Sequence, residues 1–312
     1  MAKPTAAFGW PFWGPPPTIE ERASKILTHT PLIDGHNDLA ILIRERYNNH
    51  INDEKFQKMF LEGGMPAHVD LPRLKEGKVG GAFWSALIPC PKNGSGFSNE
   101  NYAHSNSTSS DASNPSTPPT SHHDLAHVSR DTMLDVLGGG SSDWTGSAAP
   151  PIFSHSSAYP LCPHPRNVPD DVLHLDKARG SVVMINFMPD FVSCVAADPP
   201  NDSGIPDFDE AGSTLERVAD HVVYIGELIG FEHVGIGSDF DGIGKTPRGL
   251  EDVTKFPDLV GELLRRGVSD GDVAKVVGGN ILRVWAEADR VALRMQEEGE
   301  MPLEDDLPSV EW

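Results

Sequence analysis

Short apolar runs that end in polar residues recur along the chain and predict the strands of a buried parallel sheet. Such runs are apolar throughout because helices cover both faces of a parallel sheet. The predicted strands lie at residues 31–36, 80–88, 151–154, 181–187 and 233–239, with residues 125–128 as a further candidate.

Helical spacing of apolar residues fills the segments between these runs. A helix is predicted over residues 18–27, since Pro17 suits a first turn and Glu20 and Glu21 lie near the positive end of the helix. Two more apolar faces cover residues 215–229 and, with short breaks, residues 259–295. The alternation of strand and helix predicts an α/β barrel or an open parallel sheet.

Three segments depart from this alternation. Residues 1–17 mix proline with aromatic residues and are predicted to form an irregular N-terminal arm. Residues 92–123 are predicted to be disordered, because their central part has no large apolar side chain with which to bury a face. Residues 300–312 form an acidic tail. The barrel domain is therefore placed at residues 18–299, with the interruption at 92–123.

Charge and cysteine content narrow the class of protein. A formal net charge of −21 argues against nucleic-acid and anionic-membrane partners, because both would repel the chain. No apolar run of about 18 residues and no signal peptide is visible, so a cytoplasmic protein is expected, with secretion left open. The three cysteines, Cys90, Cys162 and Cys194, are too few for a disulfide scaffold and show no CxxC zinc spacing.

Ligand-type side chains stand at three of the predicted strand ends. His36 and Asp38 occupy alternate positions after a buried run, so both point the same way and can hold one cation. His155 and His127 end two other runs. Each has a simpler explanation alone: His36 and Asp38 as turn or capping residues, and His155 as a satisfied buried histidine. Three such histidines in one strand–helix chain favour a metal site.

A further buried run ends in two carboxylates, Asp239 and Asp241, of which Asp239 is expected to face the mouth of a barrel. The alternative is a turn-forming or calcium-like acidic loop. Arg166 follows a proline-rich loop and has the geometry to clamp a carboxylate with two hydrogen bonds. Its alternative is an ion pair with Asp170 or Asp171.

Together these segments resemble the membrane (renal) dipeptidase family, zinc-dependent enzymes of the amidohydrolase superfamily with a TIM-type (β/α)8 barrel. The resemblance implies hydrolysis of the peptide bond of dipeptides by a metal-activated water. The matching segments are residues 31–39, 80–90, 125–133, 153–159, 166–171, 182–194, 235–242, 249–253 and 280–284.

The resemblance also implies a role for each candidate. His36 and Asp38 correspond to the ligands of a first zinc, and His127 and His155 to those of a second. Arg166 corresponds to the residue that holds the substrate carboxylate, and Asp239 to the catalytic acid and base. Cys162 and Cys194 resemble a disulfide pair of the family. The implied partner is a small dipeptide, with no membrane segment, and a homodimer is left open.

The chain departs from the family pattern at one place. Between Cys90 and Leu125 it has 34 residues, where the family has two barrel strands, several helices and the glutamate that bridges both metals. A histidine that follows the fourth strand in the family is also lacking. The expected fold is therefore an incomplete TIM-type barrel, and weak or single zinc binding is expected, because two close cations would lose anionic compensation.

Three functions remain open at this point. The first is a zinc-dependent dipeptidase. The second is a catalytically impaired remnant, or the product of a mis-assembled gene model, that lacks the bridging glutamate. The third is another metal-dependent hydrolase that acts on a non-peptide amide or a lactone. Arg166 argues against the third, since a carboxylate clamp suits dipeptides.

Overall fold

A five-stranded parallel sheet forms the centre of the molecule, in the strand order β2-β1-β7-β4-β3. The structure is a computed structural model that describes residues 15–85, 123–141, 143–199 and 204–300. The strands of the sheet are β1 (Leu32–Asn37), β2 (Val79–Trp84), β3 (Ile152–Phe153), β4 (Val182–Ile185) and β7 (Val234–Ile236). All five predicted strands are present: β1 keeps the predicted length and is shifted by one residue, β3, β4 and β7 are shorter than predicted, and residues 86–88 of the second predicted strand lie outside the described residues. The predicted N-terminal arm up to residue 14, residues 86–122 and the tail from 301 lie outside the described residues.

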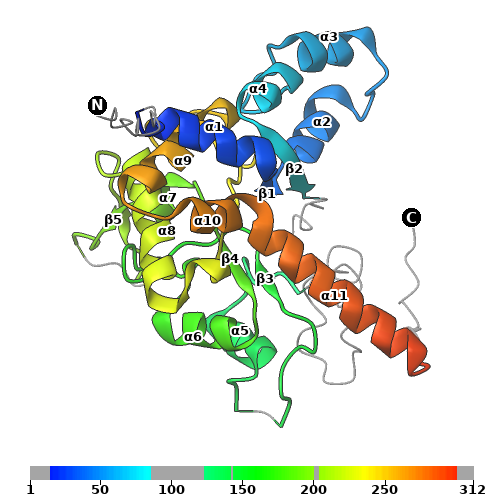
Figure 1. Cartoon of the computed structure of the whole chain (residues 1–312), viewed down its shortest axis with the longest axis vertical. Helices are drawn as coiled ribbons and strands as arrows, with labels where there is room; N and C mark the ends of the chain where they lie inside the picture. Colours follow the sequence, from blue (N-terminus) through cyan, green and yellow to red (C-terminus); the bar gives the residue numbers. More distant parts are fainter. Residues whose placement is uncertain (1–14, 86–122, 142, 200–203, 301–312) are drawn as a thin grey trace, which may run out of the picture.

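Helices surround this sheet, and α11 extends away from it (Figure 1). They are α1 (Ile19–His29), α2 (Leu39–Tyr47), α3 (Glu54–Glu62), α4 (Leu71–Glu76), α5 (Arg130–Leu137), α6 (Asp170–Ala178), α7 (Pro189–Val192), α8 (Leu215–Ile229), α9 (Phe256–Arg265), α10 (Asp270–Ala274) and α11 (Asn280–Glu297). Short 3-10 helices cover Phe231–His233 and Val253–Lys255, and a π-helical turn covers Lys275–Gly279. A small antiparallel pair joins β5 (Cys194–Val195) to β6 (Asp207–Phe208).

Side-chain caps explain where several helices begin. Thr18 caps α1 in a capping box with Glu21, so the helix starts at the position predicted from the sequence. Ser129 caps α5 and Thr214 caps α8, and each side-chain oxygen accepts a hydrogen bond from the backbone N–H three residues on. No helix in the described ranges is long and apolar enough to cross a bilayer.

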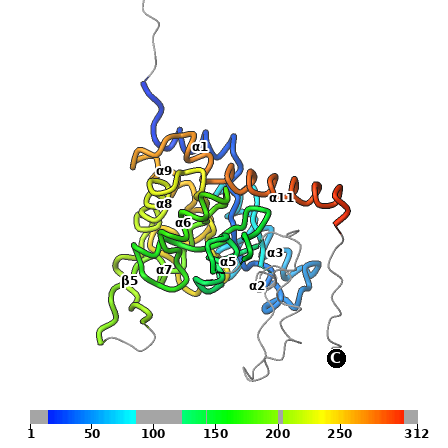
Figure 2. The backbone as a smooth tube through the Cα atoms, turned by 90° about the horizontal axis from the view of Figure 1, so that it is seen from below, coloured from blue at the N-terminus to red at the C-terminus, as the bar shows by residue number. Residues whose placement is uncertain are grey.

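Among the described residues the sheet does not close into a full ring, and we call the strands β1, β7 and β4 its closed side and the edges at β2 and β3 its open side. β7 pairs with both β1 and β4, which fixes the centre of the sheet. Its two edges are β2 and β3, and beyond β3 a single parallel bridge joins Asp124 to Ile152. Residues 86–122, which join β2 to this bridge in the sequence, lie outside the described residues and include the place where two barrel strands were expected to be lacking. The architecture is thus an incomplete TIM-type barrel, which Figure 2 shows from a second side.

The candidate strand at residues 125–128 is not formed. Pairing with Ile152 stops at Asp124 and Leu125, and the chain then enters a turn. The Asp124 side chain causes this, since its Oδ1 accepts a hydrogen bond from the backbone N–H of Ala126 at 3.1 Å. Such a bond between a carboxylate and the backbone two residues on stabilises a turn in place of extended strand.

Candidate active site

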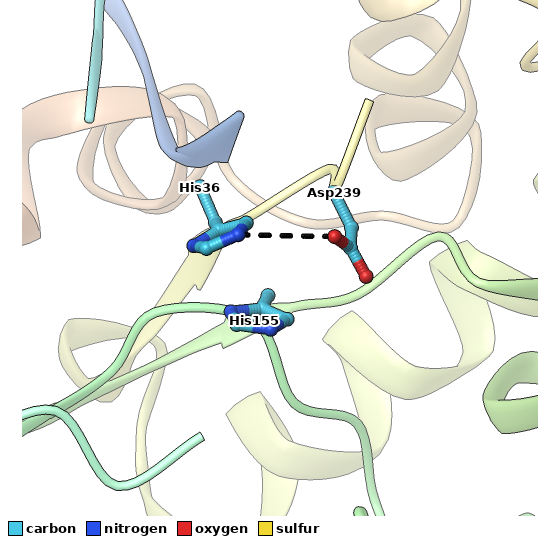
Figure 3. A group of neighbouring side chains, drawn as sticks. All are labelled: His36, His155 and Asp239. Carbon is cyan, nitrogen blue, oxygen red and sulfur yellow. Dashed lines mark ion pairs between the residues drawn. The ribbon is translucent and has the colours of Figure 1, made fainter. Parts of the chain in front are cut away.

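Three side chains from three different strand ends converge at the carboxyl edge of the sheet. They are His36 at the end of β1, His155 after β3 and Asp239 after β7. One nitrogen or oxygen atom from each lies within 4.8 Å of the others. Figure 3 shows the two imidazoles stacked face to face with the carboxylate beside them, and the ring centroids are 3.8 Å apart. Nitrogen and carboxylate ligands at this spacing are suited to a divalent cation.

The backbone at the ends of β1 and β7 is tied together where these residues emerge. Asp239 donates its backbone N–H to His36 at 3.0 Å, and Asp38 donates its own to Phe240 at 2.9 Å. Gly237 permits the close approach of β3, since a Cβ at this position would lie 1.8 Å from the Ser154 carbonyl oxygen. These backbone contacts fix where the side chains at the ends of β1 and β7 lie relative to each other.

Asp38 and His127 complete the set of ligands predicted from the sequence. Asp38 Oδ2 lies 3.3 Å from His36 Nε2. His127 Nε2 lies 2.8 Å from His155 Nε2. All four predicted ligands therefore lie around one site, as two adjoining pairs, His36 with Asp38 and His127 with His155.

Arg166 points into this site. Its Nη2 lies 3.2 Å from His127 Nε2 and 3.1 Å from His155 Nε2, while its Nε donates to the Ala126 carbonyl at 2.8 Å. The alternative ion pair with Asp170 or Asp171 is wrong. Those two carboxylates accept from Tyr224 and Arg130 instead.

Burial and charge set the protonation of the site. Burial raises the pKa of Asp239 to about 6, although His36 and Asn186 act in the opposite direction. Burial, together with the charge of Arg166, lowers the pKa of His127 to about 4. Burial also lowers the pKa of His155 well below its usual value, with further contributions from His36 and Arg166. Both histidines are therefore neutral at pH 7 and able to act as ligands.

His36 behaves differently. Burial disfavours its charged form, but the hydrogen bond and the negative charge of Asp38 outweigh burial and raise the pKa of His36 above its usual value. The carboxylate of the first pair thus favours a protonated His36, whereas the second pair has no carboxylate and both of its histidines lose their proton more readily.

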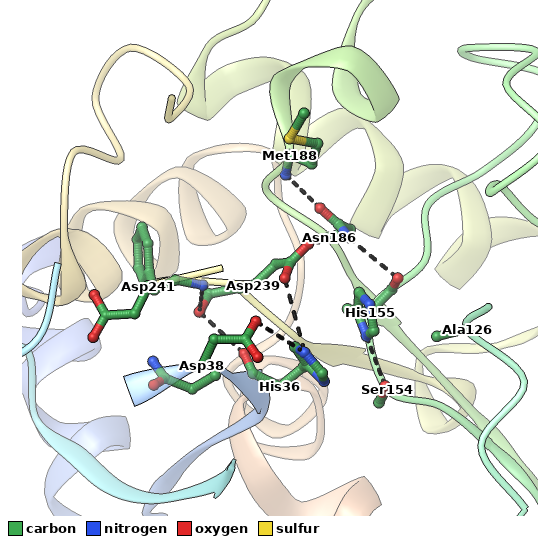
Figure 4. Close-up of polar contacts among 12 residues, drawn as sticks. His36, Asp38, Ala126, Ser154, His155, Asn186, Met188, Asp239 and Asp241 are labelled. Atoms are coloured by element: carbon green, nitrogen blue, oxygen red, sulfur yellow. Dashed lines mark hydrogen bonds and ion pairs between the residues drawn. The ribbon is translucent and has the colours of Figure 1, made fainter. Parts of the chain in front are cut away.

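The two carboxylates of the β7 loop lie in different directions, as Figure 4 shows. Asp239 faces His36, with Oδ1 3.8 Å from Nε2. Asp241 turns away and accepts from the backbone N–H of His68 at 2.7 Å. Both residues have positive φ angles, 64° and 67°. The turn-forming explanation therefore holds for Asp241, while Asp239 belongs to the site.

Asn186 is a site residue that sequence reasoning missed. It follows β4 directly, and its side-chain amide donates to Asp239 Oδ2 at 3.1 Å and to the His155 carbonyl at 3.3 Å. The signal was a polar residue at the end of a fully buried strand, as at the other strand ends. Its amide side chain is no usual metal ligand, so a pattern of histidines and carboxylates does not include it.

The cysteines lie away from the ligands. Cys162 and Cys194 form a disulfide, with Cα atoms 5.3 Å apart. Cys162 belongs to the loop that carries Arg166, and Cys194 to β5, so the bond ties that loop to the segment after α7. Cys90 lies outside the described residues.

A model of the membrane dipeptidase family, Peptidase family M19, matches residues 20–110 and 123–299. The chain belongs to this family. It is 32% identical to dipeptidase aclJ of Aspergillus oryzae, over 91% of this chain and 83% of that protein. It is 33% identical to dipeptidase verJ of Clonostachys rogersoniana, over 89% of each. The resemblance found in the sequence is confirmed, and the family is one of metal-dependent peptidases.

Solved structures show the same fold at lower identity. A metallo peptidase from Rhodobacter sphaeroides, liganded with a phosphinate mimic of the dipeptide L-Ala-D-Ala, matches with a TM-score of 0.60 and 20% identity. That match covers 83% of this chain and 99% of the other. The probable dipeptidase PvdM from Pseudomonas aeruginosa matches with a TM-score of 0.64 and 18% identity, over 88% and 99% of the two chains.

The alignment with the A. oryzae relative also measures the departure from the family. It runs over 377 positions, whereas this chain has 312 residues, so at least 65 positions of that relative have no counterpart here. The family match is broken between residues 110 and 123. This break falls within the segment that joins the two open edges of the sheet.

Proposed function

We propose that this chain carries the site of a zinc-dependent dipeptidase in a catalytically impaired form. The observation that supports the function is the convergence of His36, His155 and Asp239 at the carboxyl edge of the sheet. In parallel α/β barrels the reactive groups gather at that edge. The impairment follows from the residues that the chain lacks.

The donor set fits a zinc ion. His127 Nε2 and His155 Nε2 face each other at 2.8 Å, and both face Arg166 Nη2. A guanidinium can only donate hydrogen bonds, so an imidazole nitrogen that accepts from Arg166 presents a lone pair, while the 2.8 Å contact between the two rings needs a proton on one of them, which zinc would replace. Two converging lone pairs on neutral imidazoles are a ligand pair for zinc.

His36 and Asp38 would hold the first zinc, and His127 and His155 the second. Zinc in such a site supplies a Lewis acid for the peptide carbonyl and lowers the pKa of water.

The other residues bind substrate and move protons. Asp239 is the proposed general base, which takes a proton from the attacking water and passes it to the leaving amine. Its pKa, raised by burial to about 6, suits both steps near neutral pH. Asn186 holds one of its oxygens and so directs the other toward His36. Arg166 is the proposed clamp for the free carboxylate of the dipeptide. On substrate binding its guanidinium would leave the two histidines and donate to the carboxylate oxygens instead.

The alternative of an impaired remnant is favoured by a specific observation. Among the described residues, no glutamate belongs to the group formed by His36, His155 and Asp239, which we call the metal-ligand cluster. Without a bridging carboxylate, two dications at short range repel each other with less compensation. We therefore propose that the chain binds zinc weakly or binds one ion, and that its turnover of dipeptides is low.

Metal counting together with a dipeptide hydrolysis assay tests the proposal. The purified chain is expected to hold fewer than two zinc ions and to hydrolyse an unblocked dipeptide slowly, in a zinc-dependent manner. His155→Ala should abolish zinc binding by the His127–His155 pair, and hydrolysis with it. His174→Ala serves as the control, because His174 lies exposed on α6, away from the ligands.

Two results would contradict the proposal in different ways. Two tightly bound zinc ions with ordinary turnover would refute the impairment. Zinc stoichiometry, zinc affinity and hydrolysis that are as unchanged in His155→Ala as in His174→Ala would refute the assignment of the site.

A further inference from the structure

A hydrogen-bond chain lies behind His155, on the side away from the metal-ligand cluster. Ser154 Oγ lies 2.5 Å from Asp124 Oδ2 and 2.7 Å from His155 Nδ1. Ser154 and His155 are buried, with exposed fractions of 3% and 1%. Figure 4 shows Ser154 directly beneath the imidazole. The three side chains form the chain Asp124–Ser154–His155.

The direction of these hydrogen bonds follows from the groups involved. Asp124 accepts from the Ser154 backbone N–H at 3.0 Å with Oδ1, and from the Ser154 hydroxyl with Oδ2. The single proton of that hydroxyl is thereby used, so Ser154 Oγ can only accept from the imidazole. His155 Nδ1 must then carry the ring proton.

An independent contact on the other side of the ring leads to the same result. Arg166 Nη2 lies 3.1 Å from His155 Nε2. Because a guanidinium has no acceptor, this contact requires a lone pair on His155 Nε2, and the proton of the 2.8 Å hydrogen bond between the two rings then belongs to His127. Both edges of the ring thus indicate a proton on Nδ1 and a free lone pair on Nε2.

We propose that Asp124 and Ser154 are positioning residues that fix the tautomer of His155 and direct its Nε2 lone pair toward the metal-ligand cluster. Metal-binding histidines commonly donate their second ring nitrogen to a carboxylate or carbonyl, which sets the tautomer and the ring orientation. Here a serine hydroxyl stands between the carboxylate and the ring. The inference rests on the proposed metal-binding function of His155.

The molecule contains the same aspartate–serine pair a second time, which provides a matched control. Asp34 accepts from the Ser238 backbone N–H at 2.8 Å and from the Ser238 hydroxyl at 2.6 Å. The residue after Ser238 is Asp239, which has no tautomer, and the Ser238 Oγ accepts from the Phe240 backbone N–H at 3.1 Å. Both pairs join neighbouring strand ends, but only the Asp124–Ser154 pair continues to an imidazole.

Asparagine in place of each aspartate separates the link between strand ends, which both pairs make, from the control of a histidine tautomer, which only the Asp124–Ser154 pair exerts. In Asp124→Asn the side-chain amide would donate to Ser154 Oγ, whose hydroxyl would then donate to His155 Nδ1. The ring proton would move to Nε2, which faces the cluster and cannot bind a metal while protonated. Asp34→Asn makes the same isosteric change at a carboxylate that contacts the backbone N–H of His36, at 3.3 Å, so no ring tautomer depends on it.

The test combines nitrogen NMR of the metal-free chain with zinc titration by calorimetry. The ring nitrogens of the 13 histidines are labelled with 15N, and the His155 signals are assigned by their loss in His155→Asn. The wild-type chain is expected to carry the His155 proton on Nδ1, and Asp124→Asn to carry it on Nε2. Zinc affinity should fall by about 10-fold or more in Asp124→Asn, the usual effect of losing such a partner, and should change little in Asp34→Asn.

Several outcomes are decisive. A wild-type proton on Nε2, or an equal loss of zinc affinity in the two asparagine variants, would overturn the proposal. If thermal melting shows that Asp124→Asn is unfolded, Ser154→Ala against Ser238→Ala replaces it, with the same difference in zinc affinity expected.

The tautomer is read without metal, so the inference and the function on which it rests can fail separately. A chain that binds no zinc, yet moves the proton in Asp124→Asn, would refute the metal site and retain the hydrogen-bond chain.

Discussion

The two ligand pairs of the site sit on parts of the sheet that differ in support. His36 belongs to β1, which pairs with β2 on one side and β7 on the other. His127 follows a single bridge beyond β3, next to the open side of the barrel. The first pair therefore stands on a strand that is paired on both sides, whereas in the second pair His155 follows β3, which pairs only briefly with β4, and His127 is held by one bridge and the Asp124–Ser154 pair.

This difference shows what the missing barrel strands would contribute. In a closed barrel the segment before His127 would pair with strands on both sides, and its position would follow from the ladder. In this chain side-chain hydrogen bonds take over that task. Removal of a side chain on the open side should therefore lower mainly the affinity for metal, and removal of one on the closed side should lower mainly the free energy of unfolding.

The largest effect is expected from a matched pair of phenylalanine substitutions. Phe256 is fully buried and contacts Phe187 and Phe240, whereas Phe83 on edge strand β2 is half-buried against Trp285. Phe256→Ala should lower the free energy of unfolding by about 3–5 kcal/mol, because it leaves a cavity in a packed core. Phe83→Ala should cost far less. Urea unfolding measures both, and equal losses would show that the open edge is as well packed as the centre.

A pH effect of similar size is expected on the closed side. His221 on α8 is fully buried, and burial lowers its pKa to about 4. Below pH 6.5 the unfolded chain binds a proton at this residue while the folded chain does not. Stability should therefore fall as the pH drops from 6.5 to 4, by about 3 kcal/mol in total, at 1.36 kcal/mol per pKa unit.

Unfolding measured across this pH range in the wild-type chain and in His221→Gln checks the pH effect. The difference between the two should shrink as the pH falls. A slope unchanged by the substitution would contradict the assignment to His221.

Arg166 tests the open side through substrate binding. Arg166→Ala should raise the KM for an unblocked dipeptide about 10- to 100-fold, because a charge-assisted hydrogen bond contributes roughly 1.5–3 kcal/mol. The same dipeptide with an amidated C-terminus should show little further change, since it has no carboxylate to lose. A similar increase in KM for both substrates would remove Arg166 as the carboxylate clamp.

The smallest changes in stability are expected from the loss of two helix N-caps. Thr18→Ala at α1 and Ser129→Ala at α5 should each cost about 1 kcal/mol of stability, the usual value for a lost N-cap. Ser129 stands two residues after His127, so its loss should also weaken zinc binding. Thr18→Ala should leave zinc affinity unchanged. Melting and calorimetry on the two variants would show whether the ligand on the open side depends on its helix.

Local chemistry determined a large part of the fold and of the site. Glu20 and Glu21 predicted the start of α1 to within one residue, although Pro17 lies before the Thr18 cap and not in the first turn, and the apolar face of residues 215–229 became α8 with the same limits. Buried runs predicted all five strands of the sheet, because an apolar run bounded by turn residues has few alternatives in a chain of alternating strands and helices. The resemblance to the family brought His36, Asp38, His127 and His155 into one expected site.

Sequence spacing alone failed where a side chain competes with the backbone. The run at residues 125–128 is apolar enough for a strand, but the Asp124 carboxylate closes a turn onto Ala126 and ends the pairing. Asn186 was missed because its role is a hydrogen bond to Asp239, a residue 53 positions away. Such a contact leaves no local pattern in the sequence.

The sequence by itself determined which residue types stand at the strand ends, because burial of a parallel sheet forces polar groups to its edge. Only the tertiary structure decided how those groups face one another. Asp239 and Asp241 share one motif and one backbone conformation, yet one enters the site and the other binds His68. The direction of each is set by partners from distant strands, and those partners meet only when the sheet has formed.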